Sequence, residues 1–362
     1  MDGRVKWILV VVLLAAIAAF ALFQTRNDAA PQQIYRVEPE LIMGTSCSLV
    51  AVADRKQRAA AEDALQLAES ELRRLEALLS TWIDSSPMSR FNAAAADIEL
   101  ELPPDVLDVL LMARRLHAET GETFDITTRP LIELWRRAGD ENWLPTEAAL
   151  AQARAESNWS QLELLDRAAI KSADTARVDV DGIAKGYAID RALVLLQQAG
   201  LDGVLIEIGG DLRVFGTGPE SGAWRVAIRS PFDKRPWGEL EIDHGAVCSS
   251  GDYARYSEIG GRRYRHILDP RSGQPATESR SVTVIAPDAA TADVWATALS
   301  VLGVDGLSQL PPDSGLEALI VSGDTDDYKV WSTPGFKKRL VWSEFESMLE
   351  ISPTTRPDRP ST

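Results

Sequence analysis

Hydrophobic and polar positions follow two periods along this chain, and the two periods predict helices and strands that interleave irregularly. Apolar residues recur every three or four positions in three segments, 59–79, 107–117 and 291–302. Short apolar runs bounded by Gly, Pro or polar residues predict strands at 47–53, 203–210, 224–231 and 281–287. This order favours an α+β fold, a single large globular domain over 34–351 with a mixed or antiparallel sheet and flanking helices.

An unbroken apolar run at 7–23 precedes this domain. At about 1.5 Å per residue it would form roughly 25 Å of helix, enough for a thin bilayer. Arg4 and Lys6 predict that 1–6 stays in the cytoplasm and that the domain lies outside. A cleaved signal peptide is the alternative, but the run is long for one. We expect an uncleaved transmembrane anchor.

Two flanking segments complete the expected organisation. Residues 24–33 are polar and contain Pro31, which is typical of a linker. The tail at 352–362 is rich in Pro, Ser and Thr and is predicted to be disordered.

The composition excludes several classes of protein. A net charge of -16 and a pI near 4.8 argue against a nucleic-acid-binding protein, because an acidic surface repels phosphates. A phosphate ligand would therefore need a local metal ion or a few placed basic groups. The two cysteines, Cys47 and Cys248, are expected to be small buried residues rather than a disulfide. The chain has no Rossmann glycine motif, P-loop, nucleophile elbow or HExxH zinc motif.

The segment 177–200 is the first that carries chemistry, and it is predicted to be a strand, a turn and a helix. Asp179 and Asp181 would face the same way on the strand. Gly182 would let the backbone approach a ligand, and Lys185 would lie in the first helical turn, where a cation opposes the helix dipole. A ligand site and an ordinary solvated turn both fit this pattern.

The segment 251–275 predicts a β-hairpin around Gly260 and Gly261. Tyr264 and His266 would alternate on its second strand. His266, followed by the turn at Asp269, is either a general base or a structural histidine bonded to that turn.

Two further segments hold polar or aromatic candidates. Thr291 is expected to cap the helix that carries Asp293 and Thr297, whose four-residue spacing places both on one face. A carboxylate and a hydroxyl suit Mg²⁺, although a polar stripe on a surface helix gives the same pattern. A planar heterocycle could stack on Trp82, which lies in a polar loop, and on Phe124, which precedes Asp125. Packing of these aromatic residues in the core is the alternative.

Taken together, these segments resemble the ApbE-like family, the FAD:protein FMN transferases. The matching motifs span about 41–303: MGT, LSTWIDSSPMSRFN, GETFDIT with RPLIELW, DVDGIAKGYAIDRA, IEIGGDLRVFG, SSGDYARYSEIGGRRYRHILDPRSGQP and SVTVIAPDAATADVWATAL. Two departures are mild: Asp181 stands where a small residue is frequent, and Cys248 and Ser249 stand where Ala and Thr are common.

The resemblance implies a set of site residues. It places FAD contacts at Met43, Trp82, Thr123, Phe124, Asp125, Asp179, Lys185 and Ile267. It places a Mg²⁺ ion on the Gly182 carbonyl, Asp293 and Thr297, and a catalytic base at His266.

The resemblance also implies a reaction, which moves FMN from FAD onto a Thr or Ser hydroxyl of another protein and releases AMP. The implied acceptors are flavoprotein subunits of membrane electron-transport complexes. With the anchor, this predicts a bacterial inner-membrane protein whose catalytic domain is periplasmic. A pyrophosphatase that hydrolyses FAD and a non-enzymatic flavin-binding protein are the alternatives.

Overall fold

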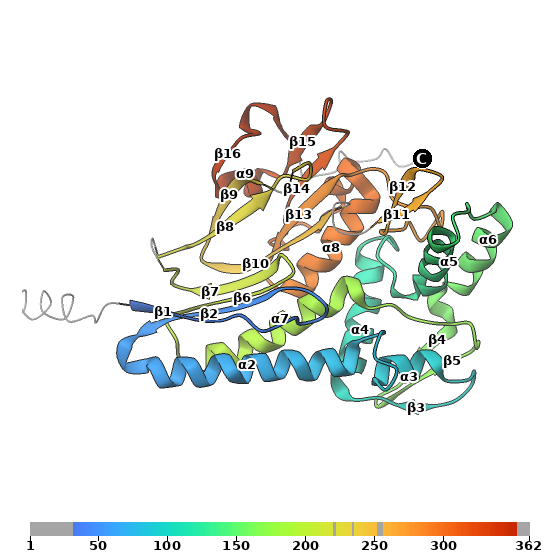
Figure 1. Ribbon diagram of the computed structural model, residues 1–362, viewed down its shortest axis with the longest axis horizontal. Helices are drawn as coiled ribbons and strands as arrows, with labels where there is room; N and C mark the ends of the chain where they lie inside the picture. Colours follow the sequence, from blue (N-terminus) through green and yellow to red (C-terminus); the bar gives the residue numbers. More distant parts are fainter. Residues whose placement is uncertain (1–31, 220–221, 234, 252–255, 353–362) are drawn as a thin grey trace, which may run out of the picture.

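The computed structural model describes residues 32–219, 222–233, 235–251 and 256–352. Nine of the described strands form one sheet, in the order β1-β2-β6-β7-β10-β13-β14-β15-β17 (Figure 1). Neighbouring strands are antiparallel except β15 and β17. The strands are β1 (Gln32–Val37), β2 (Cys47–Asp54), β6 (Gly203–Ile208), β7 (Asp211–Gly216), β10 (His244–Gly251), β13 (Ser281–Ala286), β14 (Glu317–Ser322), β15 (Lys329–Ser332) and β17 (Leu349–Ile351).

Both faces of this sheet are covered, which explains why its inner strands contain apolar residues on both sides. Along β2, Leu49, Ala51 and Ala53 belong to one core, while Val50 and Val52 belong to a second core on the other face. Strands buried on both sides read as continuous hydrophobic runs rather than as an alternation. All six residues of β13 are buried for the same reason.

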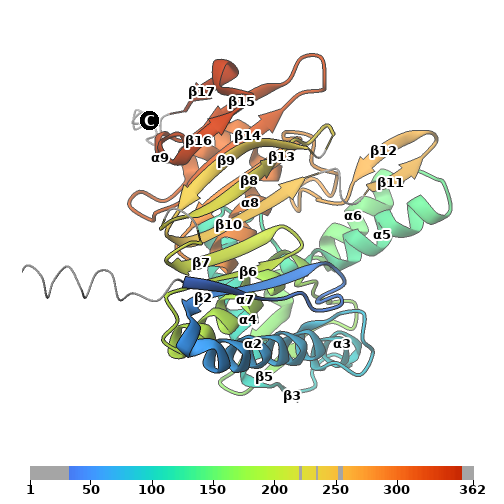
Figure 2. The ribbon, with the colours of Figure 1, turned by 60° about the vertical axis from the view of Figure 1, so that its left-hand side comes forward.

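Helices cover one face of the sheet, with α2 and α7 lying along it (Figure 2). The described helices are α2 (Arg58–Leu79), α3 (Pro87–Ala93), α4 (Pro104–Glu119), α5 (Arg129–Asp140), α6 (Glu147–Glu156), α7 (Asp181–Gln198), α8 (Ala289–Leu302) and α9 (Pro334–Arg339). A 3-10 helix, Gly303–Gln309, continues from α8.

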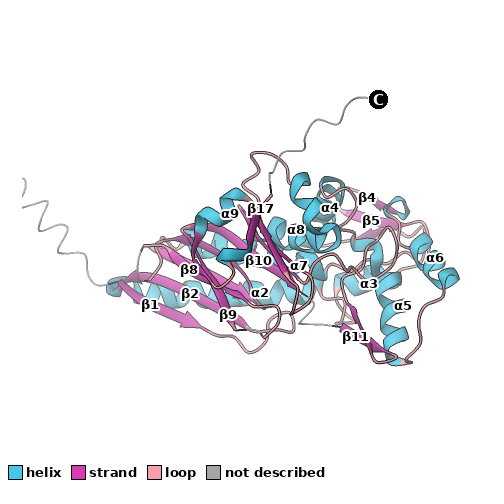
Figure 3. Ribbon diagram, turned by 90° about the horizontal axis from the view of Figure 1, so that it is seen from above, coloured by secondary structure: helices cyan, strands magenta, loops and turns pink. Residues whose placement is uncertain are grey.

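The described residues also form three smaller sheets. The sheet β16-β9-β8 covers the other face of the main sheet, and its strands are β16 (Leu340–Ser343), β9 (Pro236–Ile242) and β8 (Trp224–Arg229). A second sheet consists of β3 (Leu100–Glu101), β5 (Ala168–Lys171) and β4 (Leu162–Leu164). The hairpin β11 (Tyr256–Ile259) and β12 (Arg262–Arg265) lies with α5 and α6 at one end of the molecule (Figure 3).

This architecture confirms the predicted α+β class and most of the predicted elements. Cys47 and Cys248 are free and buried, as expected. None of the helices in the described part of the chain has the length and hydrophobicity that crossing a bilayer requires. The anchor predicted at 7–23 and most of the predicted linker and tail lie outside the described residues.

Three local expectations were wrong, and one alternative is excluded. The stretch before α7 joins no β-ladder, and the helix already begins at Asp181, so Lys185 lies beyond its first turn. Asp288, not Thr291, caps α8, because its side chain accepts a hydrogen bond from the Thr291 amide at 2.8 Å. β12 ends at Arg265, so His266 lies just beyond the strand. The alternative of a polar stripe on a surface helix is excluded, since eleven residues of α8, including Asp293, are buried.

Candidate active site

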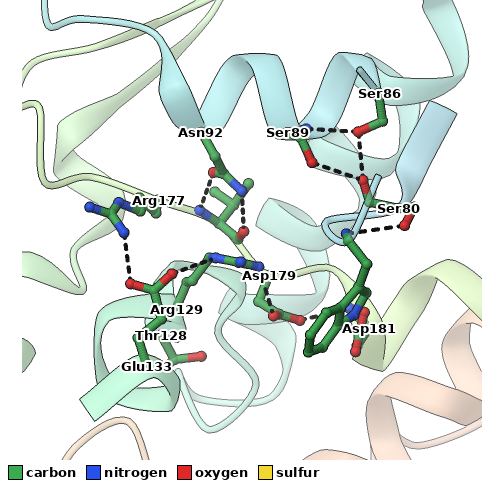
Figure 4. A network of polar contacts seen from close by, with 12 residues as sticks. Ser80, Ser86, Ser89, Asn92, Thr128, Arg129, Glu133, Arg177, Asp179 and Asp181 are labelled. Carbon is green, nitrogen blue, oxygen red and sulfur yellow. Dashed lines mark hydrogen bonds and ion pairs between the residues drawn. The ribbon is translucent and has the colours of Figure 1, made fainter. Parts of the chain in front are cut away.

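The segment leading into α7 is held by a side chain instead of a strand partner. The Asn92 amide donates to the Val178 carbonyl and accepts from the Val178 N–H, each at 2.8 Å (Figure 4). The Asp179 N–H then donates to the Ile126 carbonyl at 2.7 Å. These bonds take the place of a β-ladder, and they fix the position of Asp179 relative to α3.

Asp179 lies in a partly buried ion network. Its carboxylate accepts from the Asp181 N–H at 3.0 Å and lies 3.4 Å from the guanidinium of Arg129, the first residue of α5. Glu133 joins Arg129 at 3.0 Å and Arg177 at 2.7 Å (Figure 4). Burial, assisted by the charge of Asp181, raises the pKa of Asp179 from 3.8 to about 6.

Trp82 presents an exposed aromatic ring close to this network. Its side chain lies in the loop between α2 and α3 and is 66% exposed. The guanidinium of Arg136, on α5, lies 4.8 Å from the ring centroid, and its charge also acts on Asp179. Ser80 holds the loop with two hydrogen bonds. Its hydroxyl accepts from the Trp82 N–H at 3.1 Å, and its carbonyl accepts from the Ser86 hydroxyl at 2.6 Å. An exposed ring, two guanidiniums and a carboxylate are suited to bind a planar heterocycle.

A second charged cluster lies where α7 crosses α8. The Lys185 ammonium contacts Asp211 and lies 3.4 Å from Asp293. The Gly186 N–H donates to Asp293 at 3.4 Å, and the Ser249 N–H donates to Asp211 at 3.0 Å. Burial lowers the pKa of Lys185, but the two carboxylates outweigh this effect and raise it. Burial raises the pKa of Asp293 to about 7, although Lys185 opposes the shift.

The crossing depends on a glycine. A Cβ atom at Gly186 would lie 2.4 Å from the Ala289 carbonyl oxygen and 2.6 Å from the Ala290 Cα, so no larger residue fits without separating the helices. Asp190, farther along α7, accepts from the amides of Ala289 and Ala290 at 2.8 and 2.9 Å. α7 therefore both packs against and caps α8, which fixes the place of Asp293.

The start of α7 brings three predicted residues together. A Cβ atom at Gly182 would lie 3.2 Å from the Phe124 ring and 3.5 Å from the Thr297 hydroxyl. Thr297 is one turn after Asp293 on α8, so the hydroxyl and the carboxylate share a face. In the described residues, no three His, Cys, Asp or Glu side chains are grouped so that they could hold a metal ion.

The loop before α5 is held by its own side chains. Thr123 is 2% exposed and donates to the Thr120 carbonyl at 2.8 Å. Asp125 accepts from the Thr127 N–H and hydroxyl, each at 2.7 Å, and burial raises its pKa. The Phe124 carbonyl is bonded to His117 at 2.8 Å. These contacts place the Phe124 ring against Gly182.

His266 is exposed just after β12, where it lines a small cavity with Ile267, Gly251 and Ser300. Asp293, Thr297 and Ser300 are spaced i, i+4 and i+7, so the same face of α8 passes from Lys185 to Gly182 and then to the cavity of His266.

Helix α5 anchors the loop that follows His266. The Trp135 indole donates to the Gly273 carbonyl at 2.8 Å, and the Trp135 and Tyr264 rings lie 5.3 Å apart. The Asn142 side chain, just beyond α5, accepts from the Gly260 N–H at 2.7 Å. The same helix therefore supports Asp179 through Arg129 and the His266 loop through Trp135.

Met43 lies in the segment between β1 and β2. It adopts a positive φ of 50° in a tight turn, in which Ile42 and Thr45 exchange backbone hydrogen bonds at 3.0 and 3.1 Å. Gly209 donates to the Ser46 carbonyl at 2.9 Å and packs against the Thr45 side chain. The Met43 turn thus adjoins the glycine pair that precedes Asp211.

Sequence reasoning missed four residues of these clusters. Asp211 follows the glycine pair of IEIGGD, and Ser249 follows Cys248, so both stood inside matched motifs without an assigned role. Arg129 and Arg136 flank the apolar positions of RPLIELW. Arg129 could have been suspected from the sequence, because a cation at the first residue of a helix is unfavourable unless an anion lies nearby. Only the fold shows that this anion is Asp179.

Comparison with known proteins agrees with this architecture. A model of the ApbE family matches residues 43–320. An FAD:protein FMN transferase of Klebsiella pneumoniae strain 342 is 33% identical over 327 residues, covering 87% of this chain and 92% of that protein. One from Escherichia coli K12 is 30% identical over 343 residues, covering 90% and 97%.

Solved structures give the same result. The flavin transferase ApbE from Vibrio cholerae has a TM-score of 0.74 and 28% identity, covering 85% of this chain and all 100% of that one. The apo form of the Pseudomonas stutzeri flavinyl transferase ApbE has a TM-score of 0.74 and 30% identity, with coverage of 85% and 97%. The family match and the sequence identities show that this chain belongs to the ApbE family.

Proposed function

We propose that this chain is an FAD:protein FMN transferase, an enzyme that moves FMN from FAD onto a hydroxyl group of another protein and releases AMP. The proposal rests on one observation: Asp293 and Thr297 lie on the face of α8 that also lines the His266 cavity through Ser300. It is supported by 33% identity to an FAD:protein FMN transferase. One helix face would then present, in order, a diphosphate site and a base.

FAD would bind along the two charged clusters. Trp82 with Arg136 offers a stacking surface, and Asp179 with Arg129 offers both an acceptor and a cation within 3.4 Å of each other. The partly exposed Lys185 lies close to the buried Asp211 and Asp293, where an anionic diphosphate would find a fixed ammonium. The roles of Met43, Thr123, Asp125 and Ile267 as flavin contacts remain predictions.

The residues around Gly182 fit a Mg²⁺ ion. The Asp293 carboxylate, the Thr297 hydroxyl and the Gly182 carbonyl are hard oxygen donors, and Thr297 lies next to Gly182. One carboxylate and one hydroxyl leave coordination positions for phosphate oxygens, as is usual for this ion. When bound, Mg²⁺ would neutralise charge on the diphosphate.

His266 would act as the base. It would take the proton from an acceptor Thr or Ser hydroxyl, whose oxygen then forms a bond to the FMN-side phosphorus while the bond to the AMP phosphate breaks. Its exposed position suits a partner that must approach from solvent. The apolar run at 7–23 supports membrane attachment with the domain in the periplasm, which is where we propose that acceptor flavoproteins of electron-transport complexes are met.

Two variants test the assignment. His266→Ala should abolish covalent labelling of a candidate acceptor by FAD while leaving FAD affinity within about twofold, because the residue acts on the acceptor proton. Asp293→Ala should raise the Mg²⁺ concentration needed for half-maximal labelling. Full labelling by His266→Ala would refute the base, and an unchanged Mg²⁺ requirement in Asp293→Ala would refute the metal site.

A further inference from the structure

The two carboxylates that flank Lys185 differ in how completely they are bonded. Asp211 accepts a hydrogen bond from the Ser249 N–H at 3.0 Å and contacts the Lys185 ammonium directly. Asp293 lies 3.4 Å from that ammonium and 3.4 Å from the Gly186 N–H, and the described residues give its carboxylate no shorter hydrogen bond or ion pair. Asp293 is nevertheless only 4% exposed. A buried carboxylate with only long contacts lacks a full partner.

These contacts assign Lys185 to Asp211. Lys185 comes from α7, which packs against both β7, the strand of Asp211, and α8, the helix of Asp293. The Oδ2 atom of Asp211 contacts the ammonium, while its Oδ1 atom accepts from the Ser249 N–H. Lys185 and Asp211 therefore form a pair without net charge, and Asp293 keeps its negative charge for another cation.

Asp293 also belongs to the oxygen donors that fit a Mg²⁺ ion. Thr297 follows it by one helical turn, and the Thr297 hydroxyl lies next to Gly182. If Lys185 paired with Asp293 instead of Asp211, its ammonium would compete with a metal ion for the same carboxylate, because two cations on one anion repel each other. The partner that Lys185 chooses therefore decides whether Asp293 can bind a metal ion.

We propose that Asp211 is a positioning residue for the metal site, because it serves as the counter-ion of Lys185 and keeps the Asp293 carboxylate free for a divalent cation. The inference rests on the proposed metal-dependent transferase and adds a residue that acts on the metal ion through Lys185. Asp211 would not bind the ion itself, since both of its oxygens are already bonded. Without Asp211, the Lys185 side chain, which is 27% exposed, would turn to Asp293.

The test is a titration of the full chain with Mn²⁺ in the absence of FAD, in which electron paramagnetic resonance measures the free ion. Mn²⁺ prefers the same oxygen ligands as Mg²⁺. The proteins compared are the native chain, D211N, the double variant K185M/D211N and the control D105N. Asp105 accepts from the Tyr187 hydroxyl on α7 and pairs with Arg74, each at 2.8 Å, so D105N removes a well-bonded carboxylate that supports the same helix.

D211N should bind Mn²⁺ about tenfold more weakly than the native chain, because the ammonium and the metal ion then compete for Asp293. K185M/D211N lacks the competing ammonium and should return to within about twofold of the native affinity, where D105N should remain. An unchanged affinity in D211N would overturn the proposal. A loss that K185M/D211N does not reverse would also overturn it, since Asp211 would then be a metal ligand or a support of the fold.

Two further outcomes separate this role from the transferase. Absence of Mn²⁺ binding by the native chain would overturn the metal site, and the role of Asp211 with it. The expected affinities in a chain that transfers no FMN from FAD to any acceptor would instead refute the transferase and leave the role of Asp211 standing.

Discussion

Replacing Gly186 by alanine should show whether the close crossing of α7 and α8 builds the site. The new Cβ atom would lie 2.4 Å from the Ala289 carbonyl oxygen and 2.6 Å from the Ala290 Cα, both backbone atoms that cannot rotate away. The helices would have to separate by about 1 Å to restore ordinary contact. Lys185 and Asp293, 3.4 Å apart across this crossing, would move apart with them.

The energetic balance is set by two opposing effects. Alanine favours a helix over glycine by about 1 kcal/mol. Overpacking against backbone costs about 3 kcal/mol, the upper end of the usual range, because the neighbours cannot repack. The net loss of unfolding free energy should be about 2 kcal/mol, measured by urea denaturation.

Gly182→Ala is the matched control in the same helix. Its Cβ would meet the Phe124 ring at 3.2 Å and the Thr297 hydroxyl at 3.5 Å, which are longer contacts than at Gly186 and are made to side chains instead of backbone. The unfolding free energy should change by less than about 1 kcal/mol. If Gly186→Ala is as stable as Gly182→Ala, the crossing is looser than described and does not position Asp293.

Three further predictions concern the charged clusters. Because burial and Asp181 raise the pKa of Asp179 from 3.8 to about 6, the folded protein keeps a proton that the unfolded chain has released, so the unfolding free energy should fall as the pH rises from about 4 to about 6. Asp179→Asn should flatten this part of the profile, and an unaltered slope would show that Asp179 does not cause it. Lys185→Met leaves Asp211 and Asp293 buried without their cation and should lower the unfolding free energy, measured by urea denaturation, by about 3–5 kcal/mol. Asp211→Asn in the same chain should restore part of this loss, and a loss below about 1 kcal/mol would exclude a stabilising ion pair. Asn92→Leu removes both bonds to the Val178 backbone and should cost about 1–3 kcal/mol and weaken FAD binding; intact affinity would mean that Asp179 is positioned without it.

The sequence was sufficient where a feature depends on nearby residues. The spacing of Asp293 and Thr297 determines that they share a helical face, whatever surrounds the helix. The glycine pair at 260–261 between two short strands was enough to predict the hairpin β11–β12. Strands such as β13 were found because burial on both sides leaves a continuous apolar run.

It was insufficient where a distant residue decides the outcome. Residues 177–180 alternate like a strand, but Asn92, 86 positions away from Val178, provides the hydrogen bonds that a partner strand would have made. Thr291 is a good capping residue by type, yet Asp288 starts the helix three positions earlier. The ion pair of Asp211 with Lys185 could not be predicted, because it forms only where the fold brings β7 next to α7.

Counting products tests the central proposal most directly. The protein is incubated with FAD, Mg²⁺ and a candidate acceptor, and released AMP is quantified beside the FMN found in the acceptor by intact-mass measurement. A transferase should release one AMP for each FMN attached, and His266→Ala should do neither. AMP release accompanied by free FMN, with no mass added to the acceptor, would identify water as the nucleophile and contradict the transferase.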